Sequence, residues 1–207
     1  MTFVDQRLVV IHASARERGF TMLEVLVALL ILLIGLLGLA GLLVTTQQGE
    51  VEAYQRKQAT VLLQDIVDRV TANPVAAACY VVTTDAANGS PAFGTNYSGS
   101  FACGTGSASQ QARGSADLQA WNNALLGTSE KKGTTNVGTI IEARGCVVNP
   151  STGVYTVSVA WRGLAATVAP PAAYTCGKSQ YLDASGAVED RLRRVISVTI
   201  RIANLAA

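Results

Sequence analysis

Histidine, the commonest general acid and base in enzymes, occurs once in the 207 residues, as His12. It precedes an uncharged apolar stretch at 25–44, in a segment that we expect to be removed as a leader. The remaining chain would then have no imidazole, which excludes Ser-His-Asp and Cys-His catalysis and any histidine-ligated metal. We therefore expect a protein that is not an enzyme and that needs no cofactor.

The four cysteines, Cys79, Cys103, Cys146 and Cys176, all follow the apolar stretch. In a periplasm or outside the cell they would form disulfides, for which four cysteines allow three connectivities. We favour Cys79–Cys103 and Cys146–Cys176, because each bond would close one loop-rich excursion of the chain. Zinc bound by four thiolates is the alternative, but the sequence has no C-x-x-C pair.

A glycine turn near the C-terminus is surrounded by oxygen-bearing side chains that could bind calcium. They are Asp183, Ser185, Glu189 and Asp190. Their spacing does not match that of a calcium-binding EF-hand loop. We therefore expect a solvated turn here and no metal site.

Basic side chains gather at two places that could face DNA. They are Lys131 and Lys132, and Arg191, Arg193 and Arg194. Acidic residues stand beside both groups, and the net charge is only +2, from 16 basic and 14 acidic side chains. We therefore expect a mixed solvated surface, with no nucleic acid as the main partner.

The apolar stretch at 25–44 is the element that must position the N-terminal residues. Twenty helical residues extend about 30 Å, which matches the hydrocarbon thickness of a bilayer. Three arginines (7, 16 and 18) precede it, and the next basic residue is Arg56. By the positive-inside rule the N-terminus is cytoplasmic and residues 45–207 lie across the membrane.

Glu24 is a carboxylate at the very start of this span. An acid at membrane depth is costly, so by default it indicates a function and a positive partner. A cleaved secretory signal is the simpler alternative, but its apolar part is usually about 7–15 residues and ends in a small-residue cleavage site. The stretch here is longer and has no obvious site of that kind.

The run RERGFTMLEV at 16–25, leading directly into the apolar stretch, resembles the type III signal of type IV pilins. The resemblance implies that prepilin peptidase cleaves between Gly19 and Phe20 and that the new Phe20 amine is N-methylated. It also implies that Glu24, the fifth residue of the mature chain, directs assembly. An ammonium group at the N-terminus of a neighbouring subunit would be the partner that this carboxylate needs.

Three later segments resemble one particular family of pilins. They are DIVDRVTANP at 65–74, DLQAW at 117–121 and YTVSVAW at 155–161. In this order they are similar to the PilV family of minor pilins, although Thr71 stands where that family has a basic residue. The family implies a minor pilin of the bacterial inner membrane, and then of the cell-surface pilus, that helps to initiate assembly or lies at the pilus tip.

The implied partners are other minor and major pilins, prepilin peptidase and the pilus assembly machinery of the inner membrane. A pseudopilin of type II secretion shares every N-terminal feature and is the closest alternative. A minor pilin of DNA uptake is another.

The remaining pattern predicts an α+β, pilin-like fold. Apolar residues at helical spacing extend the first helix from about 21 to 72, where Asn73-Pro74 ends it. Alternating residues predict a hairpin of strands at 140–149 and 154–162 and a last strand at 194–203. We expect a long N-terminal helix, with a membrane-spanning first half, packed on an antiparallel β-sheet.

We divide the chain into a leader at 1–19, a membrane and filament-core helix at 20–44, an amphipathic continuation at 45–73 and a loop-rich head at 74–207. Within the head, 84–114 has the composition of a surface loop. A short helix at 117–126 follows it, and we expect Trp121 of this helix to be a core residue.

Overall fold

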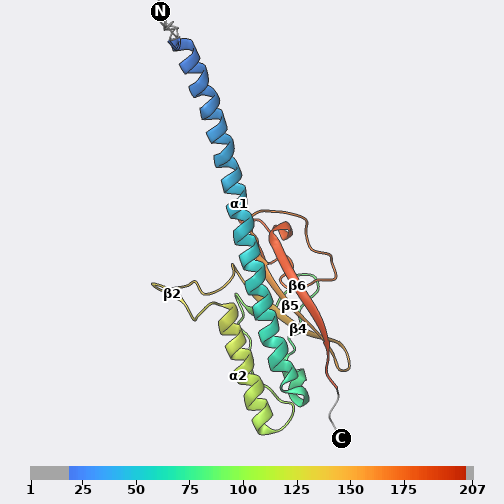
Figure 1. Cartoon of the computed structure of the whole chain (residues 1–207). Helices are drawn as coiled ribbons and strands as arrows, with labels where there is room; N and C mark the ends of the chain where they lie inside the picture. The colour runs from blue at the N-terminus through green and yellow to red at the C-terminus, as the bar shows by residue number, and fades with distance from the viewer. Residues whose placement is uncertain (1–18, 204–207) are drawn as a thin grey trace, which may run out of the picture. The chain divides into compact units, whose positions relative to one another are not determined.

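The computed structural model describes residues 19–203 (Figure 1). His12 and the three arginines of the expected leader lie outside these residues. The chain divides into two compact units, 1–46 and 47–207, with helix α1 (Met22–Thr71) contributing to both. Each unit is described by itself.

In the first unit, residues 22–46 of α1 are helical throughout, and every one of their side chains is exposed. The helix is long and apolar enough to cross a membrane. Leucine is its commonest residue, and leucine and alanine are among the residues that most favour the helical state.

In the second unit, residues 47–71 of α1 bury one face. The buried residues recur at helical spacing and are Gln55, Ala59, Leu62, Leu63, Ile66 and Val70. Helix α1 ends at Thr71, and the short 3-10 helix η1 (Pro74–Tyr80) follows with proline at its start. The end of the long helix is therefore where the Asn73-Pro74 pair predicts it.

A four-stranded antiparallel sheet has the order β1-β4-β5-β6. Its strands are β1 (Phe93–Gly94), β4 (Arg144–Ser151), β5 (Val154–Arg162) and β6 (Arg193–Arg201). Strands β5 and β6 pair along their whole length, from Val154 opposite Arg201 to Arg162 opposite Arg193. Two further strands, β2 (Lys131–Lys132) and β3 (Thr135–Asn136), form a separate small hairpin.

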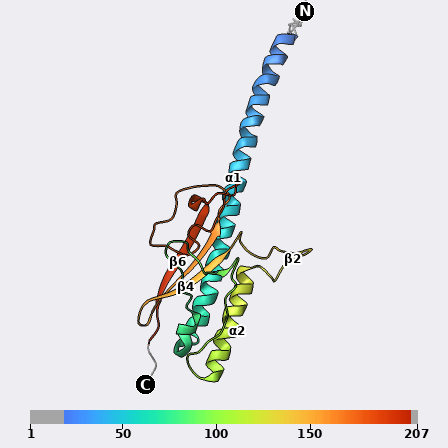
Figure 2. The same cartoon turned by 180° about the vertical axis from the view of Figure 1, so that it is seen from behind.

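The helical layer covers one face of the sheet (Figures 1 and 2). Helix α2 (Ala108–Leu125) lies beside the second half of α1, and the Trp121 indole Nε1–H donates a 2.8 Å hydrogen bond to the Leu62 carbonyl. Trp121 is fully buried in the single core of this unit, together with Phe93, Ile66 and Val157. The structure confirms the α+β class, the long helix packed on an antiparallel sheet and the core position of Trp121.

Helix α2 is longer than the sequence pattern predicts. It begins at Ala108 rather than at 117, inside the segment expected to be loop, and Ser107 is its N-cap. The Ser107 hydroxyl accepts from the Gln110 backbone N–H, and the Gln110 side chain accepts from the Ser107 backbone N–H. This capping box starts a helix whose first two turns are too polar to show an apolar face.

The first long strand is shorter than predicted, because β4 begins at Arg144 rather than at 140. Glu142 has a positive φ of 51°, a left-handed conformation that interrupts an extended strand. The last strand, β6, spans Arg193–Arg201 rather than 194–203. The β5 bounds, Val154–Arg162, are those predicted.

Candidate functional site

The residues at the start of α1 form a helix cap that fixes the position of Glu24. Gly19, Phe20 and Thr21 are exposed and not helical, and the helix begins at Met22. The Thr21 hydroxyl oxygen accepts from the Glu24 backbone N–H at 3.3 Å, and the Thr21 carbonyl accepts from the same N–H at 3.0 Å. Glu24 therefore lies in the first turn, where the helix dipole favours a carboxylate.

This geometry leaves the bond between Gly19 and Phe20 accessible in a segment without helical structure. Phe20 is 81% exposed, a large fraction for an aromatic side chain. Glu24 forms no ion pair with any residue between 19 and 203. A positive partner for its carboxylate would therefore have to come from outside this part of the chain.

The apolar stretch presents an unusually large exposed surface. From Val25 to Val44 the large side chains are about half exposed or more, and none of them is buried. Side-chain atoms added at Gly35, Gly38 or Gly41 would meet no other atom within 4 Å. No contact among residues 19–203 therefore requires glycine at these positions, which fits either a loosened helix or the close approach of another helix.

The cysteines are brought together in the two favoured pairs. Cys79 is bonded to Cys103, and Cys146 to Cys176, with Cα atoms 5.0 and 5.8 Å apart. All four sulfurs are used, so no thiolate is left for zinc. The first bond ties η1 to the segment before α2, and the second ties β4 to the long connection between β5 and β6.

The carboxylates of the predicted glycine turn near the C-terminus form hydrogen bonds and ion pairs with neighbouring residues of the same chain. The Asp183 carboxylate accepts hydrogen bonds from the Ser185 hydroxyl and from backbone N–H groups, which lowers its pKa. Glu189 pairs with Arg191 and Asp190 with Arg193, at 2.7 and 2.8 Å. Between residues 19 and 203 no cluster of three metal-ligating side chains occurs.

The arginines that could have faced DNA are already paired. Arg193 is 1% exposed and donates to the Asp190 carboxylate and to two backbone carbonyls. Arg194 pairs with Glu52 at 3.1 Å. The lysines of β2 belong to a different hairpin, so these side chains do not form one basic patch.

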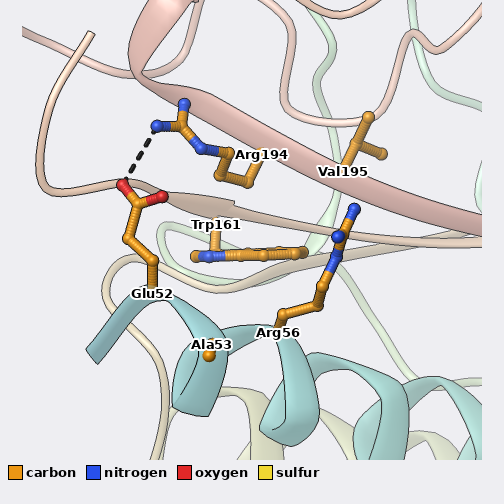
Figure 3. Close-up of a pocket in the computed structure, with 6 residues that line it drawn as sticks. All are labelled: Glu52, Ala53, Arg56, Trp161, Arg194 and Val195. Atoms are coloured by element: carbon orange, nitrogen blue, oxygen red, sulfur yellow. Dashed lines mark hydrogen bonds and ion pairs between the residues drawn. The ribbon is translucent and has the colours of Figure 1, made fainter. Parts of the chain in front are cut away.

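A pocket of about 310 Å³ lies where α1 meets the sheet (Figure 3). Glu52, Ala53 and Arg56 of α1 form one wall, and Arg194 and Val195 of β6 form the other. The flat indole of Trp161, from β5, lies between them. The ion pair between Glu52 and Arg194 joins α1 to β6 at this pocket.

Sequence reasoning missed the contacts that join distant segments. Glu52 and Arg194 are 142 residues apart. Asp117 of α2 accepts from Arg69 of α1 at 3.0 Å and from the Tyr80 hydroxyl at 2.6 Å. Burial and the bond to Asp117 raise the pKa of Tyr80 to about 12. Such pairs leave no local signal, because a charged residue alone does not indicate its partner.

Residues 14–40 match the prokaryotic N-terminal methylation motif, a prepilin-type signal. The match includes Gly19, Phe20, Glu24 and most of the apolar stretch. No curated protein and no solved structure matches the chain significantly. The motif indicates a structural protein rather than an enzyme, one that is processed by prepilin peptidase, anchored in a membrane and assembled by pilus-type machinery. Together with the helix-on-sheet fold, it supports a type IV pilin-like protein or pseudopilin.

Proposed function

We propose that this chain is a minor type IV pilin, close to the PilV family, that helps to initiate pilus assembly or lies at the pilus tip. The observation that supports the proposal is that the methylation motif, the apolar stretch and the sheet-packed part of α1 follow one another without interruption. The methylation motif runs without a break into α1, whose first part is exposed and apolar and whose second part packs on an antiparallel sheet. An enzyme has no need of this combination, whereas a filament subunit needs each part of it.

Processing would create the charge that assembly uses. Before cleavage, Phe20 is an internal residue without an ionisable amine. Cleavage after Gly19 produces an ammonium group four residues before Glu24, and N-methylation leaves that group positively charged. The Glu24 carboxylate of one subunit then binds the Phe20 ammonium of a neighbour, and the pair removes two unpaired charges from an apolar environment.

Assembly itself would be a change of packing partner. In the bilayer the side chains of 25–44 contact lipid, which is as apolar as they are, so the move into a filament gains little from the hydrophobic effect. Close helix packing and the Glu24 pair must then provide the preference for the filament. In this scheme residues 1–19 are the removed leader, 20–44 the filament core, 45–73 the continuing helix, and 74–207 the outward-facing head.

The test is deletion of the gene combined with fractionation. We expect surface pili to fall strongly in number, and the protein to be recovered in sheared filaments of the parent strain at low abundance. Normal pili with loss of protein secretion would replace the proposal with a pseudopilin of type II secretion. Normal pili with loss of DNA uptake, and salt-sensitive DNA binding by the purified full chain, would replace it with a DNA-uptake role.

A further inference from the structure

Strand β6, which follows the short 3-10 helix η2 (Asp190–Leu192), forms one edge of the four-stranded sheet. All nine of its residues pair with β5 without a bulge, and no other strand of the described residues pairs with its outer side. In both views β6 and α2 lie on opposite sides of α1 (Figures 1 and 2). The other edge of the sheet is β1, which has only two residues. A strand as short as β1 offers another chain little to pair with, whereas β6 is long enough to accept a further strand.

The backbone groups of β6 point alternately toward β5 and away from it. The Gly163 N–H donates to the Leu192 carbonyl at 2.7 Å, and the Ile202 N–H donates to the Gly153 carbonyl at 2.8 Å. These two bonds fix the alternation, so the even-numbered residues of β6 bond to β5. The odd-numbered residues of 195–201 direct their N–H and C=O groups outward, and these groups form no backbone hydrogen bond within 19–203. We call this outward row the β6 edge.

The middle of the β6 edge lacks the features by which sheets usually prevent another strand from pairing. Such features are a proline, a bulge or a charged side chain in the middle of the strand. Residues 195–200 read VISVTI, in which every residue except Ser197 is β-branched. Val198 is 37% exposed, and Thr199 is exposed as well. A further strand would therefore meet both free backbone groups and side chains that favour a sheet.

The side chains of β6 indicate which kind of strand would fit. On one face, hydroxyl groups of β5 and β6 are paired, Ser158 with Ser197 at 2.9 Å and Thr156 with Thr199 at 3.2 Å. On the other face, the even-numbered residues of 196–200 present isoleucine and valine. A strand that alternates serine or threonine with valine or isoleucine would continue both rows, because directly opposite side chains lie on the same face.

Arg201 provides a charge that the partner should match. β6 contains three arginines and no acidic residue. Arg193 and Arg194 each have an ion pair within the chain, whereas Arg201 is exposed and forms none with any residue from 19 to 203. A second copy of β6 would bring no carboxylate to Arg201 and would add positive charge to the same contact. The charge of the β6 edge therefore favours an acidic segment of another protein over a second β6.

We propose that the β6 edge binds an extended segment of another protein, which adds to the sheet as an antiparallel strand opposite 195–201. Every strand pair of this sheet is antiparallel. The segment alternates Ser or Thr with Val or Ile and places an Asp or Glu opposite Arg201. Backbone hydrogen bonds provide the affinity, and the alternating side chains and the ion pair provide the specificity. The inference goes beyond the proposed function, because it depends only on the unit at 47–207.

The test measures binding of a fluorescein-labelled synthetic peptide, EVTVTVT, to the full chain in detergent micelles by fluorescence anisotropy. In the antiparallel register its glutamate lies opposite Arg201 and its last threonine opposite Val195. Its threonine N–H groups then point toward β6, and its valine N–H groups point away. Two matched peptides carry backbone N-methyl groups, one on the first two threonines and the other on the first two valines.

We expect the valine-methylated peptide to bind nearly as well as the unmethylated one, and the threonine-methylated peptide to bind about tenfold more weakly or less, because it loses two hydrogen bonds. Two substitutions in the chain should also weaken binding of the unmethylated peptide. Arg201→Gln removes the ion pair. Thr199→Pro removes an outward N–H and leaves the bonds to β5 in place, and Thr199→Ala, which keeps that N–H, is its matched control.

Equal affinities of the two methylated peptides would overturn the proposal, because the peptide would then bind without pairing its backbone with β6. No binding of any of the three peptides at millimolar concentration would overturn it as well. Hydrogen–deuterium exchange of the full chain without peptide tests the remaining occupant. If the amides of Ser197 and Thr199 are already protected and the chain is a dimer in the micelle, a second copy occupies the β6 edge and the proposed partner is wrong.

Discussion

At the scale of residues, two carboxylates in first turns of helices have opposite environments. Asp190, in η2, forms a 2.8 Å ion pair with the fully buried guanidinium of Arg193. Glu24, in α1, is exposed and has no ionic partner among residues 19–203. A carboxylate satisfied within the chain serves the fold, whereas one left unpaired beside an apolar stretch fits a contact between subunits.

Replacing Glu24 by alanine should block incorporation and leave membrane insertion intact, because the apolar stretch remains unchanged. The measurement is the amount of protein in sheared pili relative to that in membranes, for Glu24→Ala and for the parent. The matched control is Glu50→Ala, an exposed glutamate of the same helix outside the apolar stretch. Equal recovery of Glu24→Ala and parent in pili would refute a role for this carboxylate in assembly.

The Asp190–Arg193 pair should make the stability of the head depend on pH in acid. The hydrogen bond from Arg193 lowers the pKa of Asp190 below the value of about 3.9 that an unfolded chain has. The contribution of the pair is therefore complete above about pH 4 and is lost as the pH falls through the lower, folded-state pKa. We expect Asp190→Asn to reduce the free energy of unfolding at neutral pH by about 3 kcal/mol, because it leaves Arg193 buried without its counter-ion.

The check is urea unfolding of the full chain in detergent micelles at a series of pH values. The decline in acid should be smaller in Asp190→Asn than in the parent. Asp68 is exposed and forms no ion pair with any residue from 19 to 203, so Asp68→Asn should leave the curve unchanged. Parallel curves for the parent and Asp190→Asn would show that this pair does not contribute to the pH dependence.

At the scale of elements, the contact of α2 with the sheet depends on a strand residue without a side chain. A side-chain carbon at Gly145 of β4 would collide with the Trp121 ring and with Leu125. Both belong to the buried core, which cannot make room without a shift of the helix.

Replacing Gly145 by alanine should therefore destabilise the chain by about 1–3 kcal/mol, the usual cost of overpacking. Gly104→Ala is the control, because a side-chain carbon there would meet nothing within 4 Å. The measurement is the urea midpoint of each variant in the same micelles. A Gly145→Ala midpoint equal to that of the control would mean that α2 can move away from the sheet without a penalty.

The two disulfides should differ in how readily they are reduced. Cys79 and Cys103 are partly exposed, whereas Cys146 and Cys176 are each only 3% exposed. Because a reductant must reach the sulfur, limiting dithiothreitol should reduce the first bond several-fold faster than the second. Alkylation of the native protein followed by peptide mass spectrometry gives the order. Faster labelling of Cys146 and Cys176 would contradict the burial of that bond.

Elements whose apolar residues recur at regular spacing could be predicted from the sequence. Elements that depend on contacts between distant segments could not. The second half of α1 and strand β5 show clear helical and alternating patterns, and both have the predicted bounds within a residue. Strand β1 has only two residues, and the Asn122 side chain holds it by accepting from the Gly94 N–H at 2.7 Å. A strand this short has no pattern of its own, since its partners make it a strand.

The candidate functional residues also fall into a group that the sequence predicts and a group that it does not. The motif residues Gly19, Phe20 and Glu24 could be chosen from the sequence, because their chemistry depends on local order along the chain. The pocket around Trp161 could not, because its lining comes from α1, β5 and β6, and only folding brings those together.

At the scale of the whole molecule, composition already separates the two units. Charged residues make up only 14% of the chain, and none lies between 25 and 44. The unit at 47–207 contains the sheet, the disulfides and all seven ion pairs found among residues 19–203. One unit is thus an exposed apolar helix long enough to cross a membrane, and the other is a sheet domain held by two disulfides.

The central claim is that the chain is processed at Gly19–Phe20 and enters a filament. Mass spectrometry of the N-terminus, on sheared surface filaments and on membranes separately, tests it most directly. The account predicts an N-methylated Phe20 terminus in the filament fraction. The same terminus in membranes alone would favour a pseudopilin or an assembly primer that stays behind. An intact Met1 terminus in both fractions would contradict the account, because the motif would then not be a processing signal in this protein.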